Sequence, residues 1–149
     1  MGDSNRSDLM SGWLVRLQAN GYRLTDTRRA VVQVIASSPR VLSPLDVFER
    51  ARSEYPGLGL VTVYRTIEKL EELGLVQRVH RPSGCQAFFA ASPRHEHMLV
   101  CQVCGRAEYF SGDALDKLMA DVGDESGYQV QEHWLQLFGV CKICQAKSA

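Results

Sequence analysis

Residues 62–90 read TVYRTIEKLEELGLVQRVHRPSGCQAFFA, and this stretch decides the fold of the first half of the chain. Its opening part places apolar side chains at helical spacing before a glycine, which predicts a helix over residues 62–73 with Thr62 as its N-cap. Residues 75–80 and 85–90 have the composition of strands and flank a Pro-Ser-Gly turn. A helix followed by such a hairpin is typical of a winged helix-turn-helix.

Three further helices are predicted upstream of this stretch. The first covers residues 8–20, where apolar side chains recur at helical spacing. The second begins at its N-cap Thr25 and ends at residues 37–39. The third begins at Ser43, which is followed by a proline at the first helical position, and continues to about Tyr55. Together with the hairpin they predict a winged-helix domain over residues 1–90, an architecture typical of DNA-binding domains.

The pattern changes beyond residues 91–94, which we interpret as a hinge. Residues 95–149 are expected to form a small dimerisation and metal-binding domain, so the whole chain belongs to the α+β class. A domain of this size buries only about 60% of the surface of its unfolded chain, so a metal ion or an oligomer is needed to stabilise it. Its elements are expected as strands near 98–101, 107–110 and 128–137 and a helix over 113–122.

Charge and composition restrict the function. The 149 residues carry no net charge, but residues 1–84 hold 12 Lys or Arg against 9 Asp or Glu, whereas residues 85–149 hold 5 against 8. This split of +3 and −3 indicates that only the first half faces phosphates. The sequence has no apolar run of about 18 residues and its N-terminus lacks the apolar core of a secretory signal. We therefore expect a cytoplasmic protein without a membrane partner.

Two cysteine pairs with identical spacing predict a structural metal site. Cys101 and Cys104 form the first pair, and Cys141 and Cys144 form the second. Four thiolates suit a closed tetrahedral zinc site with no open position for chemistry. The alternative, a disulfide or plain buried thiols, is disfavoured for matched pairs in a reducing compartment. The fifth cysteine, Cys85, has no partner at ligand spacing and is interpreted as an ordinary thiol of the wing.

A histidine cluster in the second domain predicts a further metal site. His95 and His97 alternate, so both imidazoles point to the same side of an extended segment. His133 precedes the second cysteine pair, just as His95 and His97 precede the first pair. Asp116 could add a carboxylate from the intervening helix. This set suits zinc, iron(II) or manganese. The alternative is that these residues are merely surface side chains, as we expect for His80.

The order of these motifs resembles that of the ferric uptake regulator family of bacterial metal sensors. The similarity runs from about Gly21 to Cys144 and includes residues 21–25, residues 60–65, the His-x-His segment and both cysteine pairs. The resemblance implies that the helix carrying Thr62 enters the major groove of an AT-rich palindromic operator. It further implies that Tyr64 packs on thymine methyl groups, that Arg65 meets a phosphate or base edge, and that Arg23 reaches the minor groove.

The resemblance also bears on the metals. Family members commonly hold a four-cysteine zinc and one or two regulatory sites, and His95, His97, Asp116 and His133 match the regulatory set within the dimerisation domain. The other family site lies between wing, hinge and dimerisation domain, and its positions here hold mostly unsuitable side chains: Val41, Phe89, Glu96, Met98 and Tyr109. Sensing through that second site, and peroxide sensing with it, is therefore not expected.

These observations lead to one main hypothesis and two alternatives. The main hypothesis is a homodimeric, metal-dependent transcription regulator that acts as a repressor of metal-homeostasis genes, with structural Zn²⁺ and a second Zn²⁺ or Fe²⁺ as co-repressor. The first alternative is a zinc-stabilised winged-helix regulator that does not sense metal. The second, a zinc hydrolase, is disfavoured because no open coordination position or adjacent general base is evident. We expect no enzymatic activity.

Overall fold

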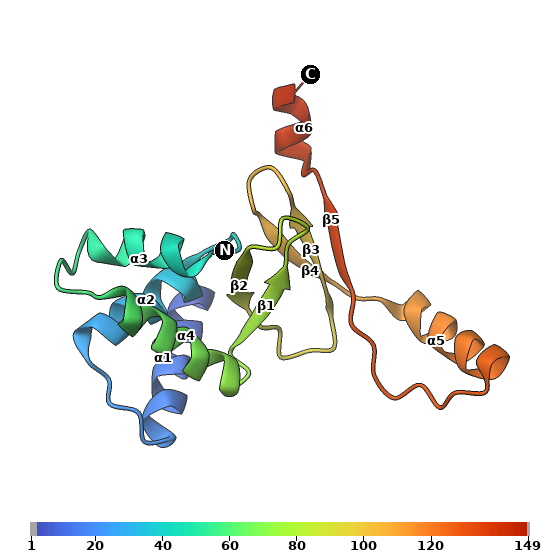
Figure 1. Ribbon diagram of the computed structural model, residues 1–149, viewed down its shortest axis with the longest axis horizontal. Coiled ribbons are helices and arrows are strands. Elements are labelled where there is room, and N and C mark those ends of the chain that lie inside the picture. The colour runs from blue at the N-terminus through green and yellow to red at the C-terminus, as the bar shows by residue number, and fades with distance from the viewer. Residues whose placement is uncertain (1–2, 149) are drawn as a thin grey trace. The chain divides into compact units, whose positions relative to one another are not determined.

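The structure, a computed structural model, describes residues 3–148 and divides into two compact units with the boundary between Ala91 and Ser92. Figure 1 shows the order of the elements. The first unit contains α1 (Asp3–Ala19), α2 (Asp26–Ser37), α3 (Pro44–Arg52), α4 (Leu60–Glu72), β1 (Val76–His80) and β2 (Gln86–Ala90). The second contains β3 (His97–Cys101), β4 (Ala107–Phe110), α5 (Asp113–Ser126), β5 (Gln136–Gly139) and α6 (Lys142–Ser148). This is the predicted α+β class.

Helices α2 and α3 begin where their capping residues predict. The Thr25 side chain accepts a hydrogen bond from the backbone N–H of Arg28 at 3.2 Å. Ser43 and Asp46 form a reciprocal capping box, in which each side chain accepts from the other residue's backbone N–H. Such caps satisfy N–H groups that have no partner inside the helix and contribute about 1 kcal/mol each. Helix α3 ends at Arg52, earlier than the expected Tyr55.

The predicted N-cap of α4 is wrong. The helix begins at Leu60 with Gly59 as its cap residue, and no side chain caps it. Thr62 lies in the first turn, where its carbonyl accepts the hydroxyl of buried Thr66 at 2.7 Å. The earlier start adds Val61 to the exposed surface of the helix.

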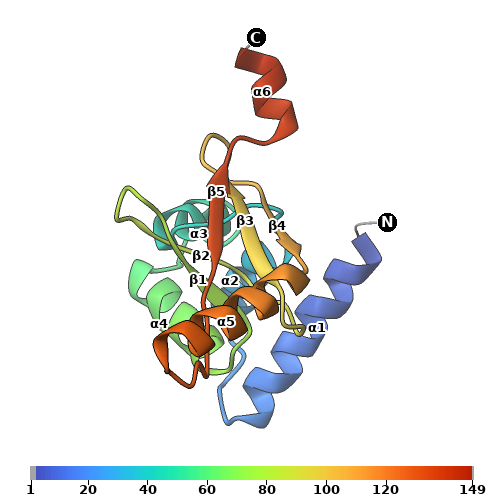
Figure 2. The ribbon, with the colours of Figure 1, turned by 90° about the vertical axis from the view of Figure 1, so that its right-hand side faces the viewer.

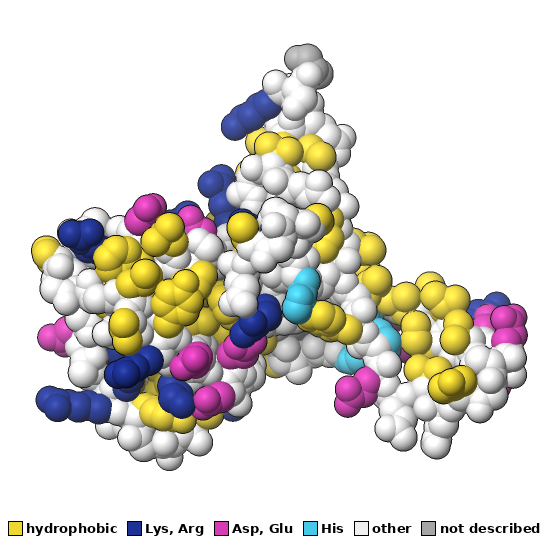
Figure 3. All heavy atoms as spheres, in the orientation of Figure 1, with side chains coloured by type: hydrophobic (Ala, Val, Ile, Leu, Met, Phe, Trp, Pro, Cys, Tyr) yellow, Lys and Arg dark blue, Asp and Glu magenta, His cyan; other side chains and the backbone are white. Residues whose placement is uncertain are grey.

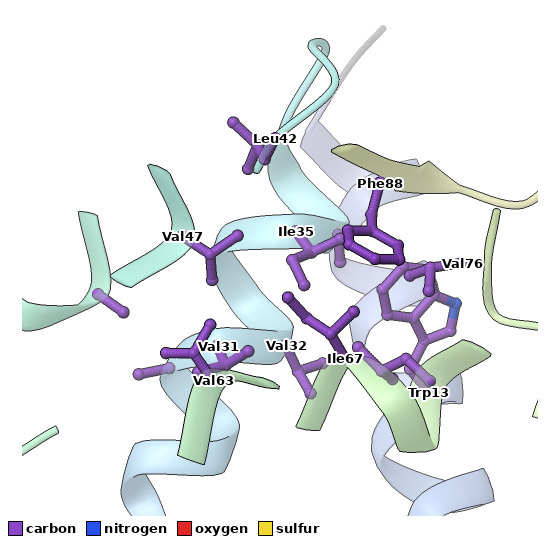
Figure 4. Close-up of a cluster of buried hydrophobic side chains, with 14 of the residues drawn as sticks. Trp13, Val31, Val32, Ile35, Leu42, Val47, Val63, Ile67, Val76 and Phe88 are labelled. Atoms are coloured by element: carbon purple, nitrogen blue, oxygen red, sulfur yellow. The ribbon is translucent and has the colours of Figure 1, made fainter. Parts of the chain in front are cut away.

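The core of the first unit joins its helices to the hairpin. Figure 4 shows Ile35 of α2, Ile67 of α4 and Phe88 of β2 within one cluster of buried side chains, together with Trp13 of α1. Burial of each large apolar side chain stabilises the unit by about 1.5–3 kcal/mol. The hairpin is fixed further because Leu42 and Phe88 exchange two backbone hydrogen bonds, of 2.9 and 2.8 Å. The winged helix-turn-helix architecture is therefore present as predicted.

The second unit is built on a small mixed sheet with the strand order β4-β3-β5. Figure 2 shows β3 between its two neighbours. Strand β4 pairs antiparallel with β3 through a tight turn, whereas β5 pairs parallel with β3 after the long excursion through α5. The expected strand over residues 128–137 is only partly correct, because the paired strand covers Gln136–Gly139. Helix α6 was not predicted.

Within the described residues, no helix combines the length and the apolar character needed to cross a bilayer.

Candidate metal centres and recognition helix

Strand β3 brings the two predicted metal-binding clusters to its two ends. His97 is the first residue of the strand and Cys101 is the last. Because β5 runs parallel to β3 and pairs Cys101 with Gly139, the residues before β5 lie near His97 and those after it lie near Cys101. His133 and Cys141 therefore reach opposite ends of the same strand. The parallel register explains why one sequence pattern, His before Cys, occurs in both segments.

The four cysteines of the two pairs form a single cluster. The sulfur atoms of Cys101, Cys104, Cys141 and Cys144 all lie within 4.8 Å of one another. The Sγ atoms of Cys104 and Cys141 are 3.8 Å apart. Zn–S bonds of about 2.3 Å in a tetrahedron place sulfurs about 3.8 Å apart, so the spacing fits a zinc ion. None of the four is in a disulfide.

The electrostatics of the cluster also suit a cation. The backbone N–H of Cys141 points at the sulfur of Cys101 from 3.3 Å, and this hydrogen bond is the main cause that lowers the Cys101 pKa to about 6. The pKa of Cys144 is raised to about 12, first by its hydrogen bond with Cys141 and then by burial. The Cys101 thiolate thus forms readily, while the Cys144 thiol resists ionisation. A dication removes this conflict by stabilising all four thiolates.

Three histidines form the second cluster. The Nε2 atoms of His95 and His133 are 3.3 Å apart, and those of His133 and His97 are 3.5 Å apart. All three candidate ligand atoms lie within 4.8 Å of one another. Metal–nitrogen bonds of about 2.0–2.1 Å in a tetrahedron require nitrogens about 3.3–3.4 Å apart. The donor set and its spacing therefore fit a divalent cation of that size. His80 lies in β1, outside this cluster.

The structure places His97 in a closely packed pocket. Its side chain is buried, and its ring centroid is 5.6 Å from that of Phe110. Burial is the main cause that lowers the pKa of His97, followed by the positive charge of His133 and then of His95. The neutral imidazole that results has a lone pair available for a metal. Gly112 lies directly against the ring, since a Cβ on Gly112 would come within 2.6 Å of Nε2.

Asp116 does not join the histidines. Its carboxylate is not part of the group of ligand atoms within 4.8 Å of one another. It lies in the first turn of α5, and its charge acts on His97, where it opposes the lowering of the pKa. The assignment of Asp116 as a ligand therefore stays a prediction. The sequence did not indicate Phe110 and Gly112, which only the packing around the ring identifies.

Helix α4 presents a mixed exposed face. Tyr64 is 49% exposed and Arg65 is also exposed, while Val61, one turn earlier, is 63% exposed. Thr62 is half-buried in the first turn. Arg23 lies elsewhere, in the exposed connection between α1 and α2, where its carbonyl accepts a hydrogen bond from the Arg28 guanidinium at 2.5 Å. The predicted DNA-contacting residues therefore come from two segments of the first unit.

Comparisons with known proteins agree with these features. The model of the ferric uptake regulator family matches residues 19–138. The chain belongs to the ferric uptake regulator family. Relatives include the ferric uptake regulation protein of Cupriavidus metallidurans, which is 34% identical over 122 residues, 81% of this chain and 85% of the relative. The corresponding protein of Neisseria meningitidis is 28% identical over 135 residues, 90% of this chain and 94% of the relative.

The solved structure of a zinc uptake regulator complexed with zinc and DNA has a TM-score of 0.72 and 20% identity, and the match covers 97% of this chain and 98% of that one. At this identity the likeness concerns the fold. Membership of the ferric uptake regulator family makes the chain a metal-responsive, DNA-binding transcription regulator and not an enzyme. Proteins of this family are dimeric.

The second unit exposes apolar side chains on its helix and its sheet. Helix α5 buries none of its side chains, and Leu118 and Val122 are 50% and 45% exposed. Figure 3 shows hydrophobic side chains gathered over α5. On the sheet, the register partners Leu99 and Leu137 are 42% and 43% exposed. Exposed apolar side chains in such number on a unit of this size mark an interaction surface.

Proposed function

We propose that this protein is a metal-dependent transcriptional repressor of metal-homeostasis genes. One zinc ion is held by Cys101, Cys104, Cys141 and Cys144 and stabilises the second unit. A second, exchangeable zinc ion binds at His95, His97 and His133 and acts as co-repressor. The observation that carries the proposal is the spacing of the three imidazole nitrogens, which already lie at the separations that one metal ion requires.

The chemistry of the ligands favours zinc over iron(II) as the sensed metal. Three imidazole nitrogens gathered within 4.8 Å of one another suit the tetrahedral sites in which proteins hold zinc. The affinity order of divalent metals also favours zinc. Asp116 would complete the tetrahedron, since it lies in the first turn of α5, close enough for its charge to act on His97. Metal binding would then connect α5 to the sheet.

DNA binding is assigned to the first unit. Helix α4 would enter the major groove of an AT-rich palindromic operator, with Tyr64 against thymine methyl groups and Arg65 at a base edge or phosphate. Thr62, at the start of the helix, would contact the sugar-phosphate backbone of the DNA, and Arg23 would reach the minor groove. The exposure of Tyr64 and Arg65 on one helix supports this assignment.

A homodimer would place two such helices on the two half-sites of the palindrome. The exposed apolar side chains of α5 and the sheet support dimerisation through the second unit. Metal at the histidine site would favour the DNA-competent dimer by its higher affinity for that conformation. A coupling of about 1–3 kcal/mol would tighten operator binding about 5- to 150-fold.

Metal stoichiometry tests this proposal directly. The purified protein is treated with a mild chelator and then titrated with zinc, and the metal content per monomer is measured at each stage. We expect one chelation-resistant zinc and one exchangeable zinc in the wild type, but only the resistant zinc in His133→Ala. His80→Ala is the matched control and should keep both. A wild-type protein that binds no exchangeable metal would instead be a zinc-stabilised regulator with another signal.

A further inference from the structure

The loop that leads into the histidine cluster is closed by hydrogen bonds around one serine. The hydroxyl of Ser92 donates to the carboxylate of Glu96 at 2.5 Å and accepts the backbone N–H of Arg94 at 3.2 Å. The backbone N–H of Glu96 donates to the carbonyl of Arg94 at 2.9 Å. The Ser92 hydroxyl thus bonds the backbone two residues further along the chain and also a charged carboxylate. Because a hydrogen bond to a charged group is stronger than one between neutral groups, this pair of bonds fixes the loop firmly.

Glu96 occupies a particular place in this loop. It lies between His95 and His97, but its carboxylate is not among the grouped ligand atoms of the histidine cluster. Instead it bonds Ser92 and lies near the hydroxyl of Tyr109, whose pKa is raised to about 12, mainly by burial and also by the charge of Glu96. Tyr109 in turn receives a backbone hydrogen bond from Ser92. Glu96 therefore connects the histidine segment to Ser92 and not to the metal.

Ser92 is the first residue of the second unit, directly after the last residue of the DNA-binding unit. When a metal fixes the rings of His95 and His97, the backbone between them is fixed as well, and with it the position from which Glu96 holds Ser92. The hydrogen bond between the side chains of Ser92 and Glu96 thus joins the metal site to the hinge.

We propose that Ser92 and Glu96 are positioning residues that transmit occupancy of the histidine site to the hinge between the two units. The proposal rests on the proposed function, since it describes how the same metal site would control DNA binding. Metal would still bind without the Ser92–Glu96 bond, but it would order the hinge less. Substitutions along such a connection change coupling about 2- to 30-fold.

The test separates metal affinity from coupling. For each variant, zinc affinity at the exchangeable site is measured by competition with a chelator, and operator affinity is measured with and without zinc. Ser92→Ala should bind zinc within about 3-fold of the wild type, while its zinc-dependent gain in operator affinity falls about 2- to 30-fold. Ser92→Thr, which keeps the hydroxyl, should restore the gain. Glu96→Gln should reduce the zinc-dependent increase in operator affinity. Glu125→Gln on α5 is the matched control and should leave this increase unchanged.

A second readout is amide exchange at Arg94, whose N–H bonds the Ser92 hydroxyl. Zinc should slow this exchange in the wild type and not in Ser92→Ala. If zinc tightens operator binding as much in Ser92→Ala as in the wild type, the proposal is overturned. It is also overturned if Ser92→Ala loses zinc affinity and the zinc-dependent increase in operator affinity together, because Ser92 would then be only a structural part of the metal site. If the wild type itself shows no gain, the proposed function fails first, before any variant is compared.

Discussion

Gly112→Ala should disable the histidine site without removing any of its ligands. A Cβ at this position would lie 2.6 Å from Nε2 of His97 and 2.8 Å from Cδ1 of Leu115. Ordinary contacts between such atoms are about 3.5 Å, so the imidazole must move by roughly 0.9 Å. Metal sites tolerate deviations of about 0.2 Å in ligand position. The backbone itself accepts alanine, because φ of Gly112 is −116°.

Displacement of one imidazole of three should weaken zinc binding at the exchangeable site by about 10- to 100-fold, comparable with the loss of an orienting partner. The assay is zinc competition against a chelator of known affinity, followed through the fluorescence of Trp134, which is 60% exposed and adjacent to His133. Gly139→Ala in β5 is the control, since nothing lies within 4 Å of a Cβ there. Wild-type zinc affinity in Gly112→Ala would refute the placement of Gly112 against a metal-binding His97.

Three further outcomes are expected. Cys101→Ser should release the chelation-resistant zinc and lower the melting temperature of the second unit, as measured by metal analysis and calorimetry. In the zinc-free protein, alkylation at pH 7 should modify Cys101 before Cys144, because the backbone N–H of Cys141 lowers the pKa of Cys101 to about 6 while that of Cys144 is raised to about 12. Mass spectrometry should show the rate of Cys101 modification falling as the pH drops below about 6, where its thiolate is protonated. Arg65→Ala should weaken operator binding about 5- to 150-fold in a gel-shift assay, with zinc affinity unchanged.

Local chemistry made much of the first unit predictable from sequence. Thr25 and Ser43 cap helices where expected, since a side-chain oxygen at the right offset satisfies a free N–H group whatever the rest of the chain does. The hairpin followed from its turn residues. The start of α4 was missed because Gly59 supplies no capping side chain and therefore leaves little signal, whereas Thr62 carries the side chain of a cap without acting as one.

The second unit was less predictable because its organisation depends on contacts distant in sequence. The cysteine cluster could be found from spacing, since two matched pairs have few other uses. The parallel pairing of β5 with β3 has no local signature, so the strand was expected too early, over residues 128–137. Spacing also could not reveal Gly112 or the distance of the Asp116 carboxylate from the three imidazoles, because both depend on how the start of α5 packs against His97.

The measurement that tests the central claim most directly is the operator affinity of chelator-treated protein as zinc is added back, for the wild type and for His133→Ala side by side. The chelation-resistant zinc is confirmed to be present in both. The account predicts that zinc tightens operator binding about 5- to 150-fold in the wild type and leaves His133→Ala unchanged. An equal gain in His133→Ala would contradict the claim that the histidine site controls DNA binding.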